Sequence, residues 1–515
     1  MKKHITRRQA VRIAGAGVFS VLSARAATSR QRVVVHANDR IGVIRPELHG
    51  HFAEHLGNCT YGGLWVGKNS PIPNIDGYRK QAVEYLKAVG IPVLRWPGGC
   101  FADDYHWRDG IGPYEKRPRR INLWWGQYTE DNSFGTHEFL GLCRLIGAQP
   151  YLAGNVGSGT PQELRDWVEY CNFPSGSTLS DERIANGAKE PFGIRYWGVG
   201  NENWGCGGRM TPEEYATLYR RFATYLSARG GIGPTEPYLI ACGPSRNDLE
   251  WTRRFMDHMH VRNMIQGYAM HFYSRGKSNA TKFTAETMRE QLSTFADLEK
   301  AILDQRALLD KYDKERRISL LIDEWGVWDL IPPEDEKRNG RLWQQITMRS
   351  GVAAALGLNV FHRQADKLVM GNIAQTVNVL HSLLLTEREK CIRTSTYWAF
   401  DMLKAHRAKT AVRVETGDSS PLGLSVSASR QGGELVLTLV NPKHDETMSV
   451  ECALDGASAA GAKAWLLHHP DFNACNTFDD PDRIVPKEHA VKPDGARLLI
   501  DLPPMSVCTA TVRLA

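Results

Sequence analysis

Two glutamates lie in surroundings that suit acid–base chemistry. Glu202 is the one acid in the segment YWGVGNENWGCGG and has an asparagine on each side, and Glu324 follows the apolar run LLI as part of DEWGVW. A carboxylic acid that donates a proton and a carboxylate that attacks carbon are the pair that glycoside hydrolysis requires. The alternatives are ordinary: Glu202 could be a solvated loop carboxylate, and Glu324 or Asp323 could pair with a nearby arginine.

Such a pair would also adjust its own pKa values. Two carboxylates about 5 Å apart repel each other by roughly 3 kcal/mol at an effective dielectric constant near 20, which corresponds to about two pKa units. One glutamate is therefore expected to hold its proton in mildly acidic solution, as a general acid must, while the other stays ionised.

Eight short apolar runs are expected to be the strands that position these acids. They lie near residues 48–53, 92–96, 150–153, 194–199, 238–242, 265–272, 318–322 and 367–373, and loops and helical patterns follow them. This alternation predicts an α/β fold, a (β/α)8 TIM barrel. A doubly wound sheet shows the same alternation, but polar and aromatic residues at the carboxyl ends of most runs favour the barrel. Glu202 and Glu324 end the fourth and seventh runs, so they are expected to face one cavity.

Helix boundaries are also marked in the sequence. TPQE at Thr160 and TPEE at Thr211 each predict a capping box with proline in the first turn. Another helix is expected over about 78–88, ending at Gly90.

The pattern changes near residue 395. Short strand-like runs such as LVLTLV and ARLLI, separated by turns, are typical of an antiparallel, jelly-roll-like β-sandwich, which QRVVVH near the start of the chain is expected to join. We therefore predict an export signal at 1–27, a strand of the sandwich at 28–44, a catalytic barrel at 45–394 and the sandwich at 395–515.

The first 26 residues have the composition of an export signal. They contain six lysines and arginines and no acid, an apolar run at 13–22 and a final Ala-Arg-Ala, and Thr-Arg-Arg at 6–8 resembles a twin-arginine signal. These features predict an exported protein, periplasmic or extracellular. Without this segment the formal charge falls from +7 to +1, which gives no reason to expect a nucleic-acid or membrane partner.

Metal binding is the main rival from another class of protein. His49 and His51 form an H-x-H pair in the first run, where zinc-dependent amidohydrolase barrels hold metal, but the fifth run lacks the histidine such a site also needs. Core packing or hydrogen bonding near the site is the favoured interpretation for both. The ten cysteines form no C-x-x-C pair, so a zinc cluster is not expected and most should be buried thiols.

Another acidic group follows the second run: Asp103, Asp104 and Asp109. A metal site or a second acid pair is the sharper hypothesis. We favour loop contacts and ion pairs with Arg95 and Arg108.

Long blocks of the sequence resemble the α-L-arabinofuranosidases of glycoside hydrolase family 51. They are RWPGGCFADDYHWRDGIGP, FGTHEF, AGNVGSG, YWGVGNENWGCGG, DEWGVW and ACNTFDDPDRIVP. The resemblance implies a barrel with a β-sandwich, no metal or other cofactor, a retaining mechanism, and exo-acting release of arabinofuranosyl ends from arabinose-containing polysaccharides and oligosaccharides such as arabinan and arabinoxylan. It also implies a homo-oligomer. Another retaining barrel glycosidase, a xylosidase or endoglucanase, is the runner-up, and a sugar-binding protein without catalysis is disfavoured by the intact glutamate pair.

The same resemblance assigns roles residue by residue. It makes Glu202 the general acid/base and Glu324 the nucleophile. Seven further residues are implied to bind the sugar or to line its site: Glu54, Cys100, Trp125, Asn201, His271, Tyr273 and Gln375. Cys100 stands where relatives can have asparagine, which puts its polar contact in question.

Overall fold

The structure, a computed structural model, describes residues 27–227, 232–418 and 420–515. Residues 1–26, most of the predicted export signal, lie outside this range. Among the described helices, none combines the length and the apolar character needed to cross a membrane.

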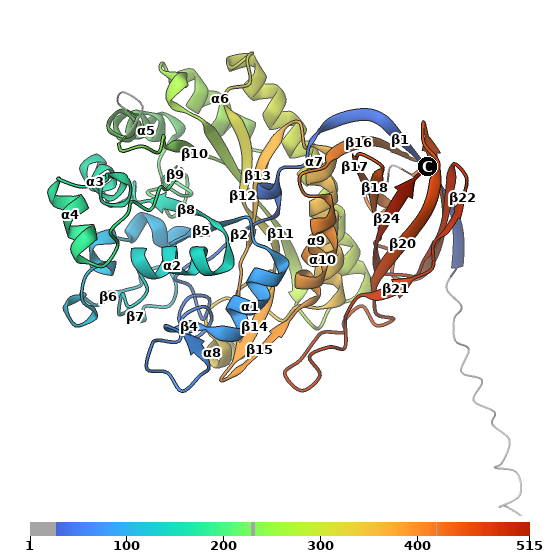
Figure 1. The fold of residues 1–515 in the computed structure, drawn as a ribbon, viewed down its shortest axis with the longest axis horizontal. Helices are drawn as coiled ribbons and strands as arrows, with labels where there is room; N and C mark the ends of the chain where they lie inside the picture. Colours follow the sequence, from blue (N-terminus) through green and yellow to red (C-terminus); the bar gives the residue numbers. More distant parts are fainter. Residues whose placement is uncertain (1–26, 228–231, 419) are drawn as a thin grey trace, which may run out of the picture.

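Eight parallel strands close into a barrel, in the order β10-β11-β12-β13-β2-β5-β8-β9 (Figure 1). They are β2 (Gly50–Phe52), β5 (Val93–Trp96), β8 (Gln149–Gly154), β9 (Tyr196–Val199), β10 (Tyr238–Ser245), β11 (Gly267–Asn279), β12 (Ser319–Leu330) and β13 (Leu368–Ala374). Each falls on one of the eight predicted runs. The (β/α)8 barrel is thus confirmed, and the doubly wound sheet is excluded because β13 pairs with β2 and leaves no open edge.

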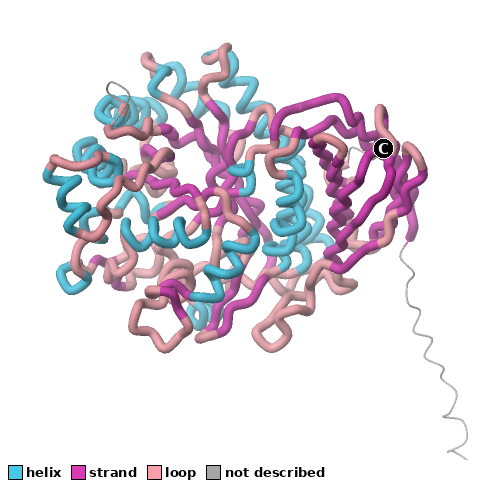
Figure 2. Tube along the Cα trace, viewed as in Figure 1, coloured by secondary structure: helices cyan, strands magenta, loops and turns pink. Residues whose placement is uncertain are grey.

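Helices surround the barrel strands (Figure 2). They are α1 (Lys80–Val89), α2 (Thr136–Ile146), α3 (Pro161–Asn172), α4 (Thr178–Ala185), α5 (Pro212–Leu226), α6 (Leu249–His258), α7 (Ala285–Tyr312), α8 (Pro333–Asn339), α9 (Met348–Arg363) and α10 (Ser395–Leu403). The capping box predicted at Thr211 is present, with both halves formed. The box at Thr160 is only half formed, because the Glu163 carboxylate contacts His106 instead.

A second, ten-stranded sheet follows the barrel. Its order is β21-β20-β24-β18-β17-β16-β1-β19-β23-β22, with β1 (Ala27–Val43), β16 (Thr410–Thr416), β17 (Ser425–Gln431), β18 (Glu434–Asn441), β19 (Glu446–Asp455), β20 (Ala459–His468), β21 (Lys487–His489), β22 (Lys492–Asp494), β23 (Arg497–Leu502) and β24 (Ser506–Leu514). The first strand pairs antiparallel with β16 but parallel with β19, so the sheet is mostly rather than wholly antiparallel. Val35, Leu437 and Ile500 belong to one hydrophobic core, which the two halves of the sheet share.

Helix α9 packs between the barrel and this sheet (Figure 1). His362 on α9 contacts Ser427 of β17 through Nδ1 at 3.1 Å and His49 of the barrel through Nε2 at 2.9 Å. These buried polar contacts fix the barrel against the sheet.

Three short hairpins lie outside these two sheets: β3 (Asn74–Ile75) with β4 (Tyr78–Arg79), β6 (Arg120–Ile121) with β7 (Thr129–Glu130), and β14 (Leu384–Glu387) with β15 (Lys390–Arg393).

Candidate active site

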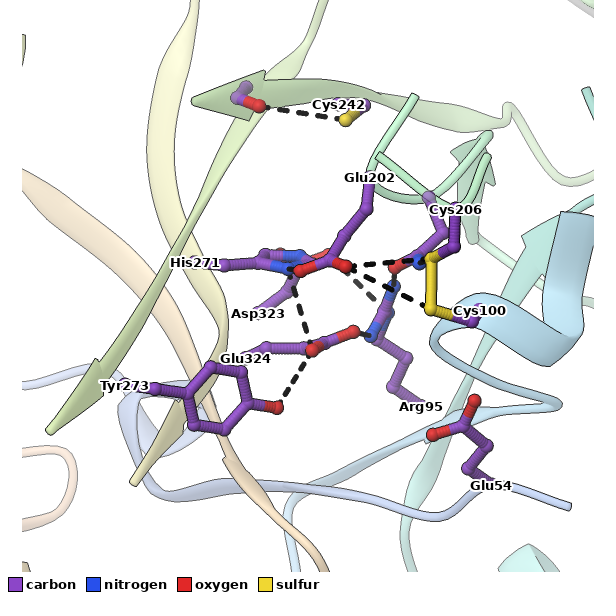
Figure 3. Close-up of polar contacts among 12 residues, drawn as sticks. Glu54, Arg95, Cys100, Glu202, Cys206, Cys242, His271, Tyr273, Asp323 and Glu324 are labelled. Atoms are coloured by element: carbon purple, nitrogen blue, oxygen red, sulfur yellow. Dashed lines mark hydrogen bonds and ion pairs between the residues drawn. A yellow bond between two sulfur atoms is a disulfide. The ribbon is translucent and has the colours of Figure 1, made fainter. Parts of the chain in front are cut away.

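The turn after β9 and the middle of β12 bring Glu202 and Glu324 into one cleft, as the sequence predicts. One oxygen of each carboxylate and one ring nitrogen of His271 all lie within 4.8 Å of one another (Figure 3). Glu202 sits just after β9 with a φ of 42°, in the left-handed region that a non-glycine residue occupies only when its surroundings hold it there. The turn therefore aims this carboxylate into the barrel mouth.

Arg95, on β5, anchors the opposite carboxylate, and its role was not predicted. Its Nη1 donates to Glu324 Oε1 at 2.7 Å, its Nη2 donates to Asn201 Oδ1 at 2.6 Å, and its Nε lies 3.3 Å from Asp323 Oδ2. Tyr273 donates its hydroxyl to the other oxygen, Glu324 Oε2, at 2.8 Å. The suspicion that Glu324 or Asp323 pairs with an arginine is correct for both, and the pairing fixes Glu324 in the site.

Burial and neighbouring cations act in opposite directions on the pKa of Glu324. Burial is the largest influence and raises the pKa of Glu324, while His271 and Arg95 lower it and Glu202 raises it further. Desolvation therefore outweighs the carboxylate–carboxylate repulsion that was expected to dominate.

His271 bridges the acids of the site. Its Nδ1 lies 2.8 Å from Glu202 Oε1 and 3.4 Å from Glu324 Oε2, and its Nε2 lies 3.1 Å from Asp323 Oδ1. Burial lowers the pKa of His271, but the three carboxylates outweigh it and raise the pKa to about 10. This imidazolium places positive charge beside Glu324, which accepts hydrogen bonds from Arg95 and Tyr273.

Glu54, just after β2, receives three hydrogen bonds: from the backbone N–H of Phe101 at 3.1 Å, from Trp125 Nε1 at 2.8 Å and from Gln375 Nε2 at 2.9 Å. Burial, and then the charge of Glu324, raises its pKa to about 8. A Cβ on Gly99 would lie 2.5 Å from both carboxylate oxygens, so glycine is required beside it. These contacts hold a polar wall in place next to the acid pair.

Cys100 is joined to Cys206 by a disulfide, and Cys206 was not singled out from the sequence. The two sulfurs lie 3.9 and 3.5 Å from Glu202 Oε2. A disulfide carries no hydrogen to donate, so these are van der Waals contacts. The bridge ties the loop after β5 to the loop that carries Glu202.

Asp103 organises this loop rather than forming an ion pair. It accepts hydrogen bonds from the backbone N–H groups of Val156, Gly157 and Asn201 at 2.7 to 2.8 Å, and burial raises its pKa to about 7 despite them.

The prediction that Arg95 and Arg108 pair with the acidic group after the second strand was wrong. Asp109 pairs with Arg120, and Arg108 pairs with Glu182. Arg95 is instead drawn into the barrel, where Asp323 and Glu324 are closer.

One cleft contains eight of the nine sequence-predicted residues, and the ninth, Asn201, is buried behind it against Arg95. Nine residues of the same lining were not predicted, and four of them have aromatic or cationic side chains: Trp204, Arg246, Arg275 and Trp328. The tryptophan in DEWGVW was a signal for Trp328, but nothing in the sequence near the two arginines marks them.

The H-x-H pair has a structural place away from the cleft. His49 ends a short 3-10 helix ahead of β2, at the amino end of the barrel, where it contacts His362. The His51 ring packs 4.8 Å from Phe400. Both are buried, and burial lowers both pKa values. They fit the predicted packing role.

Comparisons with known proteins agree with this architecture. The models "Alpha-L-arabinofuranosidase 1 domain" and "Alpha-L-arabinofuranosidase C-terminal domain" match residues 85–291 and 323–506. An intracellular exo-α-L-arabinofuranosidase of Bacteroides ovatus is 41% identical over 492 residues, covering 93% of this chain and 94% of that one. A family 51 arabinofuranosidase structure from Xanthomonas axonopodis pv. citri superposes with a TM-score of 0.90 at 35% identity, covering 94% and 100%.

The first of these relatives corrects one prediction. It is named an intracellular enzyme, which contradicts the expected export of this chain. A basic, alanine-rich first segment has the composition of a leader, but composition alone does not determine a compartment.

Proposed function

The chain belongs to the α-L-arabinofuranosidases of glycoside hydrolase family 51, and from this premise we propose that Glu324 and Glu202 are its nucleophile and its general acid/base. The reaction is the removal of terminal arabinofuranosyl residues from arabinose-containing glycans such as arabinan and arabinoxylan.

In the first step Glu324 attacks C1 of the arabinofuranosyl ring. The bond from C1 to the leaving oxygen breaks, and Glu202 gives that oxygen its proton. In the second step Glu202 takes a proton from water, the water oxygen bonds to C1, and the ester to Glu324 breaks. Two inversions at C1 retain the configuration.

The separation of the two carboxylates carries this proposal. Retaining glycosidases hold them about 5–5.5 Å apart, whereas inverting enzymes need about 6.5–9.5 Å to admit a water. Oxygens of Glu202 and Glu324 within 4.8 Å support the retaining arrangement.

The surrounding donors support the assignment of the nucleophile. Arg95 and Tyr273 donate hydrogen bonds to Glu324, and the His271 ring lies 3.4 Å from its Oε2, so donors and positive charge favour the ionised form of Glu324. Glu202 has one oxygen beside His271 and the other beside the disulfide. Its less buried position suits a group that must exchange protons with a leaving group and with water.

The remaining residues would hold the sugar. Glu54, Gln375 and Trp125 form one hydrogen-bonded wall, which suits contacts to ring hydroxyls. Asn201, fixed by Arg95, would bond the 2-hydroxyl, where interactions strengthen toward the transition state.

We assign catalysis to the barrel segment 45–394 and a supporting role to 28–44 and 395–515, because all of these side chains come from the barrel. Assembly into a homo-oligomer stays a prediction. Light scattering tests it by measuring whether the molar mass in solution exceeds that of one chain.

Two variants test the pair. Glu324→Ala should lose several orders of magnitude in kcat on a 4-nitrophenyl arabinofuranoside. Glu202→Ala should lose far more activity on poor leaving groups than on good ones, and added azide should yield the azido sugar of retained configuration. Glu290→Ala, an exposed glutamate on α7, is the matched control. Near wild-type rates for Glu324→Ala would remove it from the mechanism, and an aryl xyloside cleaved faster than the arabinofuranoside would favour the runner-up.

A further inference from the structure

We propose that the mouth of the cleft recognises a carboxylate on the leaving-group side of the substrate, through Arg246 and Arg275. The inference rests on the proposed function, because the acid pair at the cleft floor fixes where the arabinofuranosyl ring lies and so leaves the mouth for the rest of the substrate. The chemical class is an arabinofuranoside whose aglycone is anionic, such as a uronic-acid-bearing glycan.

The charges in the cleft are divided by depth. The acids in its lining, Glu54, Glu202 and Glu324, are buried or half-buried at the floor. The arginines in its lining, Arg246 and Arg275, are exposed. A substrate carboxylate at the mouth would therefore meet guanidinium groups before it meets any acid of the lining.

Arg275 is held in place by stacking on an aromatic ring rather than by an ion pair. It follows Tyr273 by two residues on β11, so both side chains leave the same face of the strand. Its guanidinium lies over the Trp328 ring at 4.3 Å from the centroid, and Tyr273 packs on the same ring at 5.2 Å. No carboxylate of the described residues lies within ion-pair distance of Arg275. Stacking fixes the guanidinium plane but leaves its N–H edges open to a ligand.

Arg246 reaches the mouth from the end of β10. Its φ of 53° is in the left-handed region, and its backbone N–H donates to the His271 carbonyl at 2.7 Å. The guanidinium lies 5.0 Å over Phe272. Among the described residues, one carboxylate lies within ion-pair distance of Arg246: that of Asp297, which is 4.0 Å away and 66% exposed. Such a solvated pair holds a side chain weakly. The strained backbone thus presents a second cation that a substrate anion can engage.

These two groups predict selectivity rather than catalysis. Each solvated guanidinium–carboxylate contact strengthens binding by up to about fivefold, so two acting together give roughly a tenfold preference in kcat/KM. Salt should weaken the preference, because exposed pairs are screened.

The test compares two aryl arabinofuranosides, the 3-carboxyphenyl compound and its 3-carbamoylphenyl counterpart, which is neutral and of nearly the same shape. The quantity measured is the ratio of their kcat/KM values. Comparing that ratio between wild type and variants cancels the difference in leaving-group chemistry. Arg246→Gln, Arg275→Gln and the double variant should lower the ratio stepwise by about tenfold in all.

Arg289→Gln on α7, an exposed arginine outside the cleft lining, is the matched control and should leave the ratio unchanged. In wild type, 0.5 M sodium chloride should reduce the ratio. A ratio that is the same in the double variant and in wild type overturns the carboxylate site, even though the carbamoyl substrate is still cleaved in a Glu324-dependent way. Loss of that dependence on Glu324 would instead overturn the proposed function.

Discussion

Tyr273→Phe removes a single hydrogen bond from the candidate nucleophile and nothing else of comparable size. The hydroxyl donates to Glu324 Oε2 at 2.8 Å, in a buried setting. A hydrogen bond to a charged group contributes about 1.5–3 kcal/mol. At about 1.4 kcal/mol per factor of ten, kcat/KM on an aryl arabinofuranoside should fall by roughly 10- to 150-fold.

The same change should move the pH profile. Burial already raises the pKa of Glu324, and the tyrosine hydroxyl favours the ionised carboxylate. Losing that donor raises the pKa further, so the acidic limb of kcat/KM should shift to higher pH. A purely structural defect would lower activity without moving this limb.

Tyr219→Phe is the matched control, because its hydroxyl also donates a hydrogen bond, to the Met264 carbonyl at 2.9 Å, but lies away from the cleft. It should leave both the rate and the limb unchanged. If Tyr273→Phe folds normally, retains kcat/KM within about threefold and keeps its acidic limb, then the donors around Glu324 do not act as described.

Two further outcomes concern stability. Cys206→Ser removes a disulfide between residues 106 positions apart and should lower the free energy of unfolding by about 2–4 kcal/mol. Dithiothreitol should lower the melting temperature of wild type but not that of the variant. An equal shift in both proteins would contradict the disulfide. Burial lowers the pKa of His381 to about 4, and its Nδ1 accepts from the Val327 N–H, so the folded state binds fewer protons than the unfolded state below about pH 6.5. Lowering the pH from 8 to 5 should therefore reduce the free energy of unfolding of wild type by about 2 kcal/mol through this residue. In urea titrations, the decrease over this pH range should be smaller by that amount in His381→Gln than in wild type. Equal decreases in the two proteins would refute the assignment.

The barrel could be predicted because its signals are local. Each barrel strand contains a short buried apolar run, and helix starts such as Thr211 carry their own capping residues. The site residues that were missed depend on distant partners. Arg95 meets Glu324, and Cys206 meets Cys100, only after the barrel closes.

The parallel pairing of β1 was hidden for the same reason. QRVVVH shows that a strand forms, but not that it lies between β16 and β19. The direction of pairing depends on strands whose positions the local pattern does not encode.

The position of β1 between β16 and β19 delays formation of the ten-stranded sheet during synthesis of the chain. Val33 pairs with Thr416 and Cys452, so a strand that is synthesised before the barrel has no partners until the whole barrel has been made. Until then its unpaired edges are available to other chains or to a chaperone. Assembly of the ten-stranded sheet is thus a late event that needs segments from before and after the barrel.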